Sequence, residues 1–536
     1  MVSSTAIAGS WLVALLLINR YVHPFSNWTF YPLLFLGLSA RRIYYWRIYP
    51  FHVSKLRNLA QIDYPLHPLW GHFHGEAMER SDGTALLDRV ELLPEGTQLM
   101  RVLGLLNTER VMLVSLQALQ DVLQTQCYEF PKPPYITKQL QGVLGNGLLF
   151  AEGEAHKRQR KLLMPAFSYG RIKSLVPVFL QEANRLSNVL ESKLSASESK
   201  IGMSPLVSRL TLDIIYRTGL GTQFDALENP DNKLALAYDT IFSPRGKTSK
   251  IFFLLAMLVP MFYRLPFKRN VVLRQSRETM NKFATDAIEK KIEKFRESEK
   301  NDVKYESKDV DLISIMIEEG PKEWGVQDMA DQLLTFLVAG HETTASAVCL
   351  ALDHLCKNPA IQTRLRNEIH AAFPEGYNTI QTYDDVESLS FLNNVIREVL
   401  RVTPPVVATV RQASQDCLVA GQFIPKGTNV AVPLAVINRL KSIWGEDARE
   451  FRPDRWDDPK LLAGGNSMAF LTFIAGPRAC IGRRFSELEY KSILIALVGK
   501  FEFAFIPGEE EIKFSSRITY RPVGSMPLNV TKVQGW

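Results

Sequence analysis

A single cysteine, Cys480, lies in a short loop whose neighbours suit a reactive sulfur. Gly476 and Gly482 bracket it, and Arg478 precedes it by two residues. Glycines allow turns with φ > 0 and a close approach of backbone to a bulky group. Backbone N–H groups and a nearby guanidinium lower the pKa of a thiol and so favour the thiolate. The pattern predicts a stabilised thiolate at the start of a helix that begins near Arg483, where the helix dipole also favours negative charge.

A second candidate lies in the longest predicted helix, from about 328 to 357. Apolar residues at its centre surround Gly340, Glu342 and Thr343. A buried carboxylate needs partners or water. A mid-helix glycine costs about 1 kcal/mol relative to alanine, and close approach of a flat cofactor would explain it. Thr343 also has a simpler interpretation, because its hydroxyl can bond back to a carbonyl one turn earlier and bend the helix.

Two sequence motifs connect these candidates to a known family. A lone cysteine is most simply a small buried hydrophobe, but that leaves the surrounding Phe, Gly and Arg residues unexplained. The loop from Phe473 to Gly482 reads F-x-x-G-x-R-x-C-x-G, and every specified position matches the haem-ligand loop of the cytochrome P450 family. The run from Ala339 to Thr344 resembles the oxygen-activation motif A-G-x-[DE]-T-[TS] of the same family. The resemblance extends from Tyr64 to the C-terminus.

The resemblance implies a haem b cofactor (iron protoporphyrin IX) with the Cys480 thiolate as the axial iron ligand. Phe473 would pack against the loop and the haem face, and Glu342 and Thr343 would deliver protons on the oxygen side. His156 stands where the family has tryptophan, but its imidazole N–H can still donate to a propionate. The cofactor-binding residues implied are Cys480, Phe473, Gly476, Arg478, Gly482, Arg411, Arg160, His156, Ala339 and Gly340.

A pair of charged residues predicts a structural lock. Glu398 and Arg401 are three residues apart and share one face of a helix predicted over 391–402. Apolar neighbours indicate that the pair is buried, and a buried pair needs a further partner. The resemblance supplies Arg455 as that partner, in a network that holds the fold around the haem loop.

Length and composition favour one large catalytic unit. The chain has 536 residues, 46% of them hydrophobic, and five scattered cysteines that argue for a reducing compartment. We expect an anchor over 1–42, a proline-bearing linker over 43–75 and a haem-thiolate catalytic domain over 76–536. The resemblance implies a mainly α fold with a smaller β-rich region and haem between two long helices. Residues 518–522 look like a closing hairpin that turns near Val523 and Gly524.

The N-terminus predicts membrane attachment. Residues 4–18 and 22–40 are apolar, although each is short for a span of about 20 residues. No Lys or Arg precedes Arg20, which argues against a cleaved signal peptide. We expect a retained transmembrane anchor, either one span or a hairpin. Basic residues from Arg41 to Arg57 place the catalytic domain on the cytoplasmic side, in the endoplasmic reticulum membrane. Residues 251–258 predict a buried helix or a second membrane contact.

The reaction implied by the resemblance is monooxygenation, in which one atom of O₂ enters a lipophilic organic substrate and the other leaves as water. Electrons would come from NADPH through a membrane reductase, docked on Arg483, Arg484 and Lys491. Residues 435–439 resemble fungal biosynthetic members, which suggests secondary metabolism. The net charge of +7 is modest, and no basic run is interleaved with aromatic residues, which excludes a nucleic-acid binder.

Two other classes of function remain open at this stage. A haem-thiolate isomerase or dehydratase needs no O₂, but the intact Glu342 and Thr343 count against it because such an enzyme needs no proton relay. A non-enzymatic, membrane-anchored binding protein would leave all of these motifs without a use.

Overall fold

The computed structural model describes most of the catalytic region. The described residues are 27–62, 64–72, 81–229, 232, 236–237, 267–300, 311–319, 324–458, 468–516, 519–534 and 536. The first apolar stretch, 4–18, and the expected helix or membrane contact at 251–258 lie outside them.

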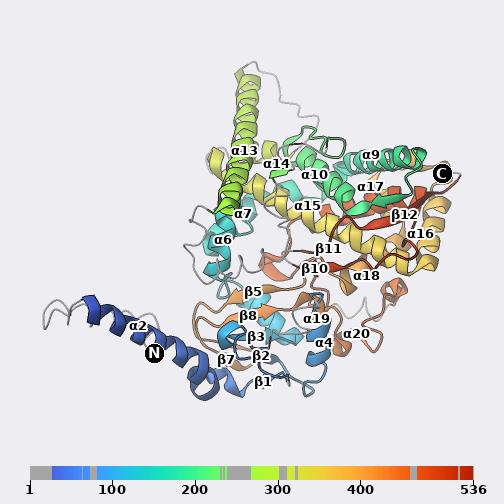
Figure 1. Cartoon of the computed structure of the whole chain (residues 1–536). Coiled ribbons are helices and arrows are strands. Elements are labelled where there is room, and N and C mark those ends of the chain that lie inside the picture. Colours follow the sequence, from blue (N-terminus) through green and yellow to red (C-terminus); the bar gives the residue numbers. More distant parts are fainter. Residues whose placement is uncertain are drawn as a thin grey trace.

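Helices form most of the body (Figure 1). They are α2 (Asn27–Ile43), α4 (Thr84–Val90), α5 (Leu116–Gln120), α6 (Pro134–Leu144), α7 (Gly153–Leu163), α8 (Tyr169–Ser174), α9 (Val176–Ser195), α10 (Met203–Leu220), α13 (Lys268–Lys300), α14 (Leu312–Glu319), α15 (Val326–Lys357), α16 (Pro359–Ala372), α17 (Tyr383–Glu387), α18 (Ser390–Val402), α19 (Leu434–Ile437), α20 (Lys441–Trp444) and α22 (Arg483–Lys500). The mainly α fold expected from the sequence is confirmed.

A five-stranded sheet lies at one side of this helical body (Figure 1). Its order is β1 (Ala60–Gln61), β2 (Leu99–Leu103), β3 (Glu109–Leu113), β8 (Asn429–Val432) and β5 (Thr409–Gln412). The β1–β2 and β3–β8 pairs are parallel, and the other two are antiparallel. Three smaller sheets pair β4 (Lys200–Gly202) with β12 (Pro527–Lys532) and β9 (Phe501–Ala504), β6 (Cys417–Val419) with β7 (Gln422–Ile424), and β10 (Phe514–Ser516) with β11 (Tyr520–Pro522).

The C-terminal hairpin differs from the expectation. Strand β11 pairs antiparallel with β10, in the register Ser516 to Tyr520. The turn expected at Val523 and Gly524 instead leads into β12, which pairs with β4 and β9. Sequence spacing identified a strand here but not its partner, because pairing partners are set by tertiary contacts.

Helix α15 is the central element of the core. From Met329 to Cys356 it is buried on nearly every side, with polar residues such as Gln332 and Glu342 among the buried ones, and it packs against α10, α13 and α22. Pro359 follows its end and starts α16, since proline fits the first turn of a helix but not its interior. Among the described residues, α15 is the one helix long and apolar enough to cross a membrane, yet 83% of its apolar window is buried inside the protein. It is therefore a core helix.

Helix α2 has the opposite character. It projects from the body (Figure 1), and two short helical segments, η2 (Tyr44–Val53) and η3 (Lys55–Asn58), join it to β1. Its large apolar side chains face outward, with Tyr31, Phe35 and Leu36 exposed by 61%, 73% and 66%. Its last turn carries Arg41 and Arg42.

Candidate active site

The loop that carries Cys480 is fixed by its own backbone. The Cys480 N–H donates to the carbonyl oxygen of Phe473 at 2.9 Å. Gly476 has φ +74°, and a Cβ atom there would lie 2.0 Å from the Leu123 carbonyl oxygen. The requirement for glycine is thus confirmed at Gly476. At Gly482 the φ is −86° and the nearest atom to a Cβ is 3.9 Å away, so the turn does not use a positive φ there, and the close approach of a bulky group to Gly482 stays a prediction.

The thiol of Cys480 faces space inside the protein. The residue is accessible to solvent, yet burial raises the pKa of its thiol, opposed by a hydrogen bond from the Gly482 N–H and by the positive charge of Arg160. The lowered pKa expected from Arg478 is therefore wrong. Arg478 turns away to Glu152 and to the Ala151 carbonyl, and Arg160 donates to the carbonyl oxygen of the residue before Cys480 at 2.7 Å.

One short strip of the surface of helix α15 is accessible, and we call it the open strip. From Met329 to Cys356 every residue is buried except Ala339, Gly340 and Thr343. Positions i, i+1 and i+4 lie on the same face of a helix, so these three residues form a continuous surface within the core. The acid–alcohol motif identified from sequence therefore includes the exposed part of an otherwise buried helix.

Two residues of this strip have local packing explanations. The Thr343 hydroxyl donates to the Ala339 carbonyl at 2.7 Å, which is the back-bonded geometry considered from the sequence. A Cβ at Gly340 would lie 2.8 Å from the end of the Ile215 side chain on α10. The packing of α10 against α15 therefore favours a small residue at Gly340, and the close approach of a flat cofactor stays a prediction.

Glu342 points toward the C-terminal segment. It is 6% exposed, and its Oε1 accepts from the Thr519 hydroxyl at 2.9 Å and lies 3.3 Å from Arg521 Nη1. The expectation that this buried acid has partners is confirmed. Sequence reasoning missed both partners, since they lie about 180 residues away in a segment that carries no motif.

A group of cations gathers near the N-terminus of α7. Glu152 accepts from the Lys132 N–H at 3.0 Å and pairs with Arg478, whose Nε is buried without a hydrogen-bond partner among the described residues. Arg411 is 3% exposed, and one of its nitrogens donates to Thr409 Oγ1 at 2.8 Å. We call Lys132, His156, Arg160, Arg411 and Arg478 the cation cluster.

The pKa values in the cation cluster show that Glu152 only partly compensates its burial and its positive charge. Burial and Arg411 lower the pKa of Lys132 to about 7. Burial and Arg478 lower the pKa of Arg411 to about 10 and that of His156 to about 4. The sequence identified His156, Arg160, Arg411 and Arg478 but missed Lys132. It also missed Tyr128, whose hydroxyl lies 3.2 Å from His156 Nδ1.

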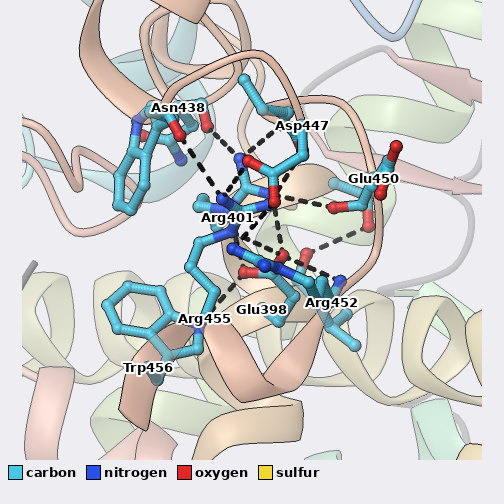
Figure 2. A network of polar contacts seen from close by, with 12 residues as sticks. Glu398, Arg401, Asn438, Asp447, Glu450, Arg452, Arg455 and Trp456 are labelled. Carbon is cyan, nitrogen blue, oxygen red and sulfur yellow. Dashed lines mark hydrogen bonds and ion pairs between the residues drawn. The ribbon is translucent and has the colours of Figure 1, made fainter. Parts of the chain in front are cut away.

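The structural lock predicted from sequence is confirmed and is larger than expected (Figure 2). Glu398 Oε1 lies 2.8 Å from Arg401 Nη2 and 3.2 Å from Arg455 Nε, and all three side chains are at most 1% exposed. Arg401 also donates to the carbonyls of Asn438, Ala448 and Glu450. Further contacts come from Trp456 Nε1 to Glu398 and from Arg455 to Asp447. We call this group the Glu398 network.

One expected docking residue is not available at the surface. Lys491 is buried, and its Nζ lies 2.5 Å from Glu387 Oε1. Arg483 is about half exposed and pairs with Glu487 at 3.0 Å, and Arg484 is exposed. The basic docking surface proposed from sequence therefore loses Lys491, because the tertiary fold supplies it with a carboxylate.

The family model for cytochrome P450 matches residues 65–526. The chain belongs to the cytochrome P450 family. Its relatives include the cytochrome P450 monooxygenase sphH of Aspergillus fumigatus, 37% identical over 443 residues and covering 80% of each chain. The cytochrome P450 monooxygenase ALT8 of Alternaria alternata is 32% identical over 518 residues, covering 84% of this chain and 85% of the relative. FUM15 of Gibberella moniliformis, also a cytochrome P450 monooxygenase, is 34% identical and covers 81% of each.

This P450 is a haem-thiolate monooxygenase by these likenesses, and its own residues fit the haem group. A thiol faces internal space at Cys480. The cation cluster has an excess of positive charge and an unpaired, buried nitrogen on Arg478, which suits the two carboxylates of a porphyrin. Glu152 does not fit a site for carboxylates as well, because its own carboxylate already pairs with the guanidinium of Arg478.

Proposed function

We propose that this P450 oxidises a lipophilic organic molecule of fungal secondary metabolism, with Cys480 as the iron ligand and the cation cluster around the haem propionates. Bound haem supplies the activation of O₂ and the transfer of one oxygen atom to the substrate. The observation that carries the proposal is the pair of accessible surfaces inside an otherwise buried core. One is the thiol of Cys480, and the other is the strip of Ala339, Gly340 and Thr343. We assign them to the two sides of the haem.

Thr343 and Glu342 are the residues proposed to move protons. Because the Thr343 hydroxyl donates to Ala339, its oxygen keeps lone pairs that can accept a hydrogen bond from a water on the oxygen side. Glu342 faces away from that strip and pairs with Arg521, which is 29% exposed. We propose that Glu342 exchanges protons with solvent through this side and passes them toward Thr343. Delivery of this kind contributes about 10²–10⁴-fold to a rate.

Two variants test the assignment. Cys480→Ser should lose the red-shifted Soret band that a thiolate ligand gives to the reduced, CO-bound protein. Thr343→Ala should keep that band and NADPH consumption but divert electrons to hydrogen peroxide, while Thr343→Ser should restore product. The measurement is product and peroxide formed per NADPH oxidised, with reductase present. Unchanged product yield in Thr343→Ala contradicts its role, and product formed without O₂ or NADPH contradicts monooxygenation.

We further propose that the chain is anchored in the endoplasmic reticulum membrane with its catalytic domain on the cytoplasmic side, where a membrane reductase supplies electrons from NADPH. The exposed apolar surface of α2 and the two arginines that end it support this arrangement. Deleting Met1 to Arg42 should move the protein into the soluble fraction of a cell lysate with its haem retained. Full retention on membranes would assign attachment to another surface.

A further inference from the structure

A buried acid, Glu489, lies on α22 nine residues after Cys480 and takes no part in the contacts described above. It is 1% exposed, and neither of its carboxyl oxygens has a hydrogen-bond partner of ordinary geometry among the described residues. The side chain that faces it is Thr344 of α15, which is 2% exposed and whose hydroxyl is equally without a partner of such geometry. Burial raises the pKa of Glu489 well above its ordinary value, and the Thr344 hydroxyl opposes this.

A purely structural role explains Glu489 poorly. An isolated buried charge is too costly to keep, so a carboxyl without a neighbouring cation is held neutral. A leucine would fill a similar volume without desolvating a polar group. Buried polar groups that lack partners usually indicate a function or an interaction that forms under other conditions. The pairing of two such groups, on two different helices and facing each other, indicates that they are partners.

The position of this pair connects the two sides of the active site. Helix α22 directly follows the Cys480 loop, and α15 carries Glu342 and Thr343. Thr344 adjoins Thr343, and successive helical residues point about 100° apart, so Thr344 faces α22 while Thr343 faces the open strip. One residue further along α22, the Tyr490 hydroxyl donates to the Ala347 carbonyl of α15 at 3.0 Å, so the two helices are in direct contact here.

We propose that Glu489, as a neutral carboxylic acid, donates its proton in a hydrogen bond to the Thr344 hydroxyl and thereby sets the rotation of α15 against α22. Glu489 is then a positioning residue for Thr343. Without the bond, this turn of α15 loses a contact that fixes it against α22, and the Thr343 hydroxyl shifts from the place where it accepts a hydrogen bond from a proton-carrying water. The inference rests on the proposed role of Thr343.

The effect on the reaction is tested with four variants of the full-length, haem-loaded protein. Glu489→Gln keeps a neutral donor and should keep the wild-type yield of product per NADPH. Glu489→Leu and Thr344→Val should each lower that yield by about two- to tenfold, the range that one hydrogen bond is worth. The double variant should fall no further than either single one. Ser492→Ala is the matched control, because Ser492 is a buried residue of α22 that bonds within its own helix, to Leu488.

The bond itself is tested by infrared spectroscopy, which does not depend on turnover. The difference spectrum of wild type and Glu489→Gln at neutral pH should contain the C=O band of a protonated acid. Thr344→Val should move this band to higher frequency, since a lost hydrogen bond strengthens C=O.

Three results would overturn the proposal. The first is the absence of the protonated-acid band from the infrared difference spectrum. The others are a product yield in Glu489→Gln as low as in Glu489→Leu, or a wild-type product yield in Glu489→Leu. If Glu489→Leu fails to fold, the spectra and Thr344→Val still decide. A normal yield in Thr343→Ala would instead remove the proposed role of Thr343 and leave the infrared test of the bond intact.

Discussion

Two groups of buried charges in this P450 differ in how completely the protein satisfies them. In the Glu398 network, Arg401 donates from all three of its nitrogens, to Glu398 and to three backbone carbonyls. In the cation cluster, Arg411 donates only to its own strand among the described residues, and Arg478 Nε has no partner there. Burial, together with the positive charge of Arg411, lowers the pKa of Lys132 to about 7.

The difference separates a fold lock from a ligand site. A buried charge is tolerable when hydrogen bonds and opposite charge compensate its desolvation. The Glu398 network meets that condition from within the chain, so it can form before any cofactor binds. The cation cluster does not meet it among the described residues, which supports our proposal that the haem propionates supply the missing negative charge. Incomplete satisfaction of buried cations is therefore evidence of a ligand of opposite charge.

The largest expected effect comes from breaking the complete network. Arg401→Ala leaves Glu398 and Arg455 without a compensating partner and should cost about 3–5 kcal/mol, giving protein with little haem. Arg452→Ala is the matched control, because Arg452 is 51% exposed where it pairs with Asp447 and should cost less than about 1 kcal/mol. Thermal unfolding and haem content measure both. Normal haem content in Arg401→Ala would contradict the role as a lock.

A substitution in the cation cluster is expected to weaken haem binding without lowering the stability of the haem-free protein. Arg411→Met removes one cation from a crowded group, so the haem-free protein should be no less stable than wild type. Haem loss to an acceptor protein should become about 10- to 100-fold faster, since a hydrogen bond to a charged group is worth about 1.5–3 kcal/mol. If the haem-free variant lost as much stability as Arg401→Ala, the distinction between the two groups would fail.

The third expected effect is a pH dependence of stability, spread over several pH units. The folded-state pKa of Lys132 is about 7, against 10.5 for an ordinary lysine. Between these values the unfolded chain holds the proton and the folded chain does not. The stability of the haem-free protein should therefore rise as pH increases from about 7 to about 10.5.

Lys132→Met should remove this part of the slope, and bound haem should reduce it by raising the pKa of Lys132. Lys193→Met, at a lysine that is 35% exposed and pairs with Glu198, should leave the slope unchanged. The midpoint of denaturant unfolding at several pH values measures it, and an unchanged slope in Lys132→Met would show that Lys132 is not the source.

The sequence by itself determined those features of this protein that depend on residues close together in the chain. Glu398 and Arg401 share a face because three residues is almost one helical turn. Gly476 is required by its own φ, and α15 follows from an apolar run of sufficient length that ends at a proline. Cys480 was singled out as the proposed iron ligand because its neighbours within the loop form a specific pattern.

Only the tertiary structure decided which distant groups meet. It turned Arg478 toward Glu152, gave Lys491 a carboxylate, and brought Thr519 and Arg521 to Glu342. It also placed Glu489 against Thr344. None of these pairs is encoded by spacing, since each joins segments that are more than 100 residues apart. Their electrostatic state depends on burial and on charges from other elements, which a linear pattern does not contain.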